Sequence, residues 1–169
     1  PPHEILQCFD VLDVYPENYG ATSAIREKTS PYLEYAEELG LSTNTCSYLR
    51  IAVGHARCIA RGESTADAPY GGLAKPTMFM TTGRICDPRI KVFDVMRRYL
   101  DIPVFMYDYM GPPCEDPRVL SREECSHYID HIVEGLKGMI SFLEEHTGKK
   151  LDGDRFAQVV KDSVEMWHL

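Results

Sequence analysis

Apolar residues recur at helical spacing most clearly between Ser121 and His146. They stand three and four positions apart, which places them on one face of a helix: Ile129, Ile132, Val133, Leu136, Met139, Ile140 and Leu143. Ser121 with Glu124 three residues later is a capping-box pattern, and Gly148 stands where a helix typically ends. We therefore predict an amphipathic helix over residues 121–146.

Two short apolar runs flank a second helical pattern. Pro76–Thr82 and Ile102–Tyr107 each predict a strand. Between them, Asp87 can cap a helix and Pro88 fits its first position. The apolar positions of that helix are Ile90, Phe93, Met96 and Leu100. The crossover is just long enough to join two parallel strands, so the order predicts a protein of the α/β class.

Weaker patterns complete the prediction. Residues 21–39 and 46–60 have helical spacing, and a last helix is expected from Asp152 to Leu169. Val11–Tyr15 is a candidate strand, while residues 62–75 and 111–117 are rich in glycine or proline and predict loops.

The composition excludes several classes of protein. With 169 residues, of which 44% are hydrophobic, the chain is typical of a globular domain, and no apolar run is long enough to cross a bilayer. The net charge of −8 gives no electrostatic footprint for nucleic acid. Neither GxxxxGK[ST] nor GxGxxG occurs in the sequence, so we expect no ATP or dinucleotide site of those types.

Six cysteines are the main candidates for chemistry, and none forms a CxxC pair. The first residues have no signal segment, so we expect a cytoplasmic protein whose cysteines are thiols or cofactor ligands. Cys46 lies in the first predicted turn of its helix, and Cys86 lies between a predicted strand and the next helix. Backbone N–H groups at such helix ends favour an anionic sulfur and support its bonds to a metal. The alternative is that both are ordinary thiols.

The other cysteines are weaker candidates. Cys8 stands among apolar residues and Cys58 in the middle of a helix, so we expect both to be packing residues. Cys114 lies in a proline-rich loop and Cys125 in the first turn after the capping box. Neither completes a recognised ligand spacing.

Two further patterns can be interpreted either as functional sites or as ordinary solvated side chains. His127 and His131 stand four apart on one helix, as zinc ligands can, but the glutamate of HExxH is missing and a solvated helix face explains them better. Glu17 follows the candidate strand Val11–Tyr15, where it could face a cleft or be a turn carboxylate in water.

Several short motifs follow one another in order along the chain: Tyr15-Pro16-Glu17-Asn18, Cys46-Ser47-Tyr48-Leu49-Arg50, Lys75-Pro76, Thr81-Thr82, Ile85-Cys86-Asp87, Asp101-Ile102-Pro103-Val104-Phe105 and Thr147-Gly148-Lys149-Lys150-Leu151-Asp152. This ordered set extends over essentially all of the chain and resembles the family of 2-hydroxyacyl-CoA dehydratases and benzoyl-CoA reductases. Each motif is loose, but their common order is fairly specific.

The resemblance implies a fold and a set of site residues. The implied fold is a Rossmann-like three-layer α/β domain over residues 1–150, shortened at its N-terminus, with a short, mostly parallel sheet and flanking helices. Residues 151–169 would begin a helix leading to a C-terminal domain. Family subunits bind a [4Fe–4S] cluster through three cysteines, which the resemblance maps onto Cys46, Cys86 and a third cysteine beyond Leu169. By resemblance, Glu17 is a catalytic residue in the substrate pocket.

The implied activity is that of an (R)-2-hydroxyacyl-CoA dehydratase. In this family a separate ATP-hydrolysing iron–sulfur activator supplies single electrons, a ketyl radical of the acyl-CoA substrate expels the hydroxyl group, and a homologous second subunit completes the enzyme. A benzoyl-CoA reductase subunit is the alternative within the family. A non-catalytic scaffold and a stand-alone cluster protein are the alternatives outside these activities.

Overall fold

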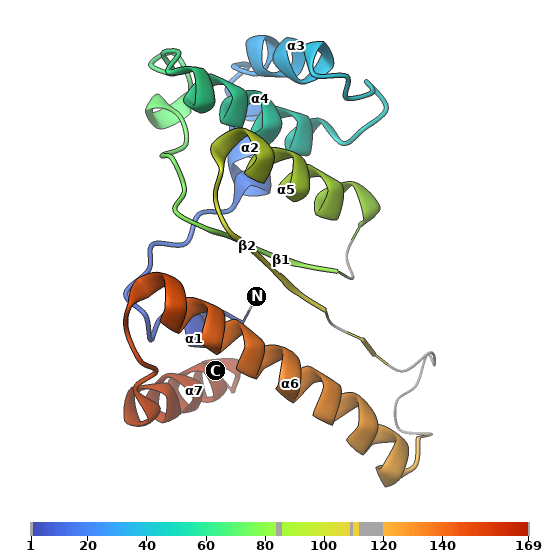
Figure 1. The fold of residues 1–169 in the computed structure, drawn as a ribbon, viewed down its shortest axis with the longest axis vertical. Helices are drawn as coiled ribbons and strands as arrows, with labels where there is room; N and C mark the ends of the chain where they lie inside the picture. The colour runs from blue at the N-terminus through green and yellow to red at the C-terminus, as the bar shows by residue number, and fades with distance from the viewer. Residues whose placement is uncertain (1, 84–85, 109, 112–119, 169) are drawn as a thin grey trace. The chain divides into compact units, whose positions relative to one another are not determined.

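The structure is a computed structural model that describes residues 2–83, 86–108, 110–111 and 120–168. Figure 1 shows a mixed α/β fold in which helices predominate. The elements in chain order are α1 (His3–Leu6), α2 (Pro16–Ile25), α3 (Ser30–Glu38), α4 (Ser47–Arg61), the 3₁₀ turn η1 (Pro69–Gly71), β1 (Phe79–Thr82), α5 (Asp87–Leu100), β2 (Val104–Tyr107), α6 (Arg122–Thr147) and α7 (Gly153–Trp167).

The predicted strand, helix and strand are confirmed. β1 and β2 form a two-stranded parallel sheet, and α5 is the crossover between them. At the start of the pairing, the Phe79 N–H donates to the Pro103 carbonyl over 2.9 Å. Both strands are shorter than the apolar runs that predicted them, because the pairing begins only at Phe79 and Val104.

The chain divides into two compact units, which we call the middle unit (Val14–Val104) and the terminal unit (Pro1–Asp13 with Phe105–Leu169). Helix α4 forms the centre of the middle unit, where every residue from Leu49 to Cys58 is buried. Its apolar face packs on α5 and β1 in one cluster: Leu49, Ala52, Val53, Ala56, Phe79, Val92, Phe93, Met96 and Leu100. On another side α3 crosses α4 so closely that a Cβ on Gly54 would lie 2.2 Å from the Tyr32 carbonyl oxygen.

The terminal unit contains α1, α6 and α7. The capping box predicted for α6 is present: the Glu124 N–H donates to Ser121 Oγ, and the Ser121 N–H donates to the Glu124 carboxylate. The N-terminal segment is tied to α7, because Arg155 donates to the Gln7 carbonyl over 3.1 Å. Within the described part of the chain, no helix has the length and apolar character that crossing a membrane requires.

Two predictions in the N-terminal third were wrong. Residues 21–39 do not form one helix, because Glu27 adopts a φ of 56° between α2 and α3, and Pro31 lies in the first turn of α3. Residues 11–15 are described and form no strand. Helix α2 instead begins at Pro16, immediately after them. The loop predicted for residues 111–117 lies outside the described residues from 112 onward.

Candidate functional site

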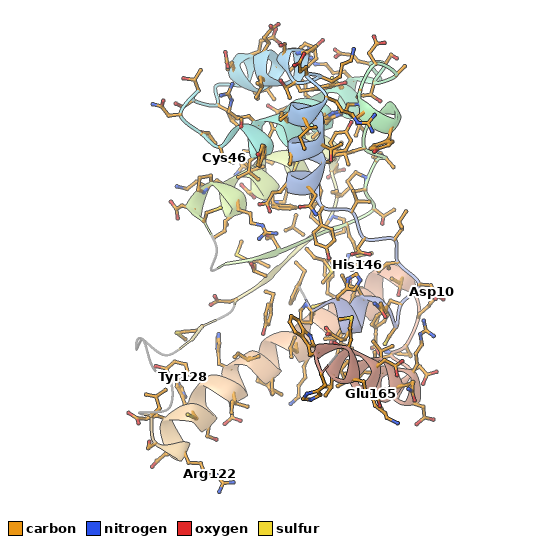
Figure 2. The ribbon with its side chains drawn as sticks, turned by 180° about the vertical axis from the view of Figure 1, so that it is seen from behind. Asp10, Cys46, Arg122, Tyr128, His146 and Glu165 are labelled. Atoms are coloured by element: carbon orange, nitrogen blue, oxygen red, sulfur yellow. The ribbon has the colours of Figure 1, made fainter. Side chains whose placement is uncertain are left out.

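Cys46 and Cys86 occupy equivalent positions on two packed helices. Cys46 is the N-cap residue of α4 and Cys86 the N-cap residue of α5, and neither side chain makes a capping hydrogen bond. Both thiols are exposed and outside any disulfide. Figure 1 shows that α4 and α5 begin on the same side of the middle unit, and Figure 2 shows Cys46 at the start of α4. The sequence predicted Cys46 inside the first turn of its helix, and the structure places it at the N-cap just before α4. The sequence suggested Asp87 as the cap of the next helix, whereas the N-cap residue of α5 is Cys86.

Glu17 lies in the first turn of α2, and it does not follow a strand as predicted. Its Oε1 is 3.2 Å from Nε of Arg89, whose side chain is 13% exposed. The Arg89 Nε is buried and has no hydrogen-bond partner among the described residues, so the contact is an ion pair without a directed hydrogen bond. Sequence reasoning missed Arg89, although its position three residues after Cys86 was a signal that could have drawn attention to it.

The starts of α2, α4 and α5 are connected by direct contacts. Glu17 joins the first turn of α2 to Arg89 in the first turn of α5. Helices α2 and α4 also approach closely, because a Cβ on Gly20 of α2 would lie 2.7 Å from the Tyr48 carbonyl oxygen of α4. The fold therefore brings the helix starts that carry Cys46, Cys86 and Glu17 into one region of the middle unit.

This region suits a group that binds through thiolates. The first N–H groups of α4 and α5 lack partners within their helices and favour negative charge close to Cys46 and Cys86. Iron–sulfur clusters are held by cysteine thiolates, and both of these thiols are exposed. Among the described residues, no three His, Cys, Asp or Glu side chains gather closely enough to hold a metal ion.

Two of the remaining cysteines are buried, as predicted. Cys8 and Cys58 are buried, as expected of packing residues, and burial raises the pKa of both thiols. Cys125 lies in the first turn of α6 and is half-buried. Cys114 lies outside the described residues.

His127 and His131 of α6 each lie near a different side chain. His131 Nε2 lies 3.9 Å from Oδ2 of Asp108, and the ring of His127 contacts that of Tyr128. Neither histidine belongs to a group of metal-binding side chains within the part of the chain that the structure describes.

Comparison with known proteins gives a consistent result. Residues 1–169 match the family model for the 2-hydroxyglutaryl-CoA dehydratase D-component. The chain is 33% identical to the (R)-2-hydroxyisocaproyl-CoA dehydratase alpha subunit of Clostridioides difficile and 31% identical to the (R)-phenyllactyl-CoA dehydratase alpha subunit of Clostridium sporogenes, in each case over 97% of this chain and 37% of the relative. It is 26% identical to a benzoyl-CoA reductase subunit of Thauera aromatica, over 96% of this chain and 35% of that protein.

The chain therefore spans little more than a third of the length of these curated relatives. The family match extends over the whole chain, including the helix starts with Cys46, Cys86 and Glu17. The chain belongs to the family of the 2-hydroxyglutaryl-CoA dehydratase D-component.

Proposed function

We propose that this chain is part of an iron–sulfur subunit of an (R)-2-hydroxyacyl-CoA dehydratase. Cys46 and Cys86 are two cysteine ligands of a [4Fe–4S] cluster, and the third cysteine comes from outside residues 1–169. The observation that carries the proposal is the meeting of three helix starts, two capped by exposed cysteines and one carrying Glu17. Family membership and the dehydratase names of two relatives support the same activity.

The chain's own residues prepare the site in two ways. The exposed N-cap position leaves each cysteine sulfur accessible, and the adjacent helix N–H groups offset the negative charge of a bound thiolate. Glu17 is a carboxylate at the same region, held beside Arg89, and it moves a proton of the acyl-CoA substrate. The cluster, when bound, supplies single electrons to the acyl-CoA thioester.

The assembly is part of the proposal. The "alpha subunit" in the names of two relatives supports a homologous second subunit. A separate ATP-hydrolysing iron–sulfur activator would deliver the electrons, and we propose a cytoplasmic location for the complex. We also propose that the parallel pair β1–β2 with its crossover α5 belongs to a Rossmann-like three-layer domain, which would extend over residues 1–150. Residues 151–169 would then lead to a further domain.

A benzoyl-CoA reductase subunit is the second candidate. It is favoured by the similarity to the benzoyl-CoA reductase of Thauera aromatica, which extends over 96% of this chain. Both candidates use the same cysteine ligands and an acyl-CoA or aryl-CoA thioester. They differ in whether a hydroxyl group is expelled or an aromatic ring is reduced.

The experiment is a metal analysis followed by a substrate screen. The full-length protein is purified without oxygen together with its partner subunit, and iron, sulfide, visible absorption and EPR spectra are measured. We expect the cluster signal in the wild type, its loss in Cys46→Ser and Cys86→Ser, and its retention in the control Cys125→Ser. Turnover of (R)-2-hydroxyacyl-CoA thioesters with the activator supports the dehydratase, and turnover of benzoyl-CoA supports the reductase. A wild type without iron would overturn both and favour a scaffold.

A further inference from the structure

Three polar atoms are buried near the end of β1 and the first turn of α5. They are Oγ1 of Thr81, Oγ1 of Thr82 and Nε of Arg89, and none has a hydrogen-bond partner among the described residues. The side chain of Thr81 is the most deeply buried, with no exposed surface at all. A buried hydroxyl without a partner costs about 1–3 kcal/mol, so native proteins pair such groups with a ligand, with water or with another residue.

Strand geometry separates the two threonines. Alternate side chains of a strand point to opposite faces, so Thr81 shares its face with Phe79 and Thr82 does not. The Phe79 face is the one that packs on α5, because the rings of Phe79 and Phe93 meet edge to face with their centroids 5.2 Å apart. Thr81 therefore faces α5.

The same contact indicates that Thr81 lies at the level of Arg89 along α5. β1 and α5 run in opposite directions, as Figure 1 shows. From Phe79 to Thr81 the strand advances about 6.6 Å. From Phe93 back to Arg89, on the same face of α5, the helix covers about 6 Å in the same direction. This geometry puts Thr81 and Arg89 at the same level along the contact between β1 and α5, and the Arg89 Nε lies 3.2 Å from Oε1 of Glu17.

We propose that Thr81 and Arg89 form a subsite that binds an oxygen atom of the acyl group of an acyl-CoA. This inference rests on the proposed function and names the residues that receive the acyl group. The Thr81 hydroxyl and the Arg89 Nε–H each donate one hydrogen bond to that oxygen, and Glu17 holds the guanidinium in place. A thioester or hydroxyl oxygen is the matching ligand, because both donors are buried and one carries a positive charge.

The test measures binding by the full-length protein with its partner subunit, loaded with its cluster and without activator, so that no turnover occurs. The ligands are the acyl-CoA selected by the screen described above and CoA alone. We expect Thr81→Val and Arg89→Gln each to weaken acyl-CoA binding about 10-fold and to leave the binding of CoA unchanged. The double variant should weaken acyl-CoA binding by less than the product of the two single-variant factors, because both donors bind the same oxygen.

The matched control is Thr82→Val, whose hydroxyl lies on the other face of β1 and is expected to contribute nothing to binding. Thr81→Ser keeps the hydroxyl and should bind acyl-CoA as the wild type does. Without ligand, Thr81→Val should raise the melting temperature by a few degrees, since it removes a hydroxyl that has no partner. A residue with only a structural role would give the opposite shift.

Two results would overturn the inference while the proposed function stands. One is unchanged acyl-CoA affinity in Thr81→Val, and the other is equal weakening of acyl-CoA and CoA binding in that variant. If Thr81→Val does not fold, wild-type affinity in Arg89→Gln would overturn it. A wild type that binds its cluster but no acyl-CoA would instead remove the proposed function, and the subsite with it.

Discussion

Helices α4 and α6 are stabilised in opposite ways. In α4 every residue from Leu49 to Cys58 is buried, yet its N-cap residue Cys46 makes no side-chain capping bond. In α6, whose 26 residues are all described, Met139 and Leu143 alone are buried, yet a complete capping box begins the helix and Gly148 ends it. Tertiary packing thus leaves the first position of α4 available for a cysteine, whereas α6 depends on its own ends.

The largest effect on stability is expected from replacing the buried Gly54 of α4. Gly54→Ala in α4 should destabilise the middle unit by about 3 kcal/mol or more. The new Cβ would lie 2.2 Å from the carbonyl oxygen of Tyr32, and a backbone atom cannot move aside as the end of a flexible side chain can. The matched control is Gly138→Ala in α6, where the new Cβ meets Phe105 at an ordinary 3.5 Å and helix propensity favours alanine. Hydrogen exchange of peptides from each helix measures both. Equal protection of α4 in Gly54→Ala and the wild type would contradict the packing account.

The stability of α4 should depend on pH through the titration of His55. This side chain is fully buried, stacks on Tyr32 at 3.7 Å, and neither ring nitrogen has a partner among the described residues. Burial lowers the pKa of His55 from 6.5 to about 4. The unfolded chain therefore binds the proton more readily, and stability should fall as the pH drops from 6.5 to 4, by at most about 3 kcal/mol.

The measurement for His55 is urea unfolding of the protein at several pH values, followed through hydrogen exchange in α4. His55→Phe keeps a stacking ring and removes the titrating group, so its stability should vary less over this pH range. An unchanged pH dependence in His55→Phe would assign the effect to other groups.

A smaller effect is expected at the start of α6. Ser121→Ala removes the side chain that accepts the Glu124 N–H and should cost about 1 kcal/mol. The loss should be confined to the first turns of α6, where faster hydrogen exchange would report it. Ser121→Asp restores an acceptor and serves as the control. Undisturbed exchange in Ser121→Ala would show that α6 does not depend on its cap.

The smallest effect on stability is expected at Cys46, the corresponding position of α4. Cys46→Ser supplies a better N-cap residue and should leave α4 as stable as in the wild type or stabilise it by about 0.5 kcal/mol. The same change should abolish cluster binding. Marked destabilisation of α4 in Cys46→Ser without bound cluster would mean that the cysteine is structural.

The sequence correctly predicted the features that depend on residues close together in the chain. The capping box, the strand–helix–strand order and the helix starts at Cys46 and Cys86 were all found within a few residues. The break between α2 and α3 was not, because Glu27 is an unusual residue for a positive φ. The Glu17–Arg89 pair could not be predicted either, since its partners are distant in sequence and meet only through the packing of α2 and α5. The role proposed for Glu17 came from the family resemblance, since the pattern of residues alone left it open.

The central claim is that the exposed N-cap cysteines of α4 and α5 are cluster ligands. It is tested most directly by the iron and sulfide content of the full-length protein, purified without oxygen with its partner subunit, in Cys46→Ser, Cys86→Ser and Cys125→Ser. The account predicts that the first two variants lose the iron and sulfide of one cluster while remaining folded, and that Cys125→Ser retains them. Wild-type iron in either Cys46→Ser or Cys86→Ser would contradict it.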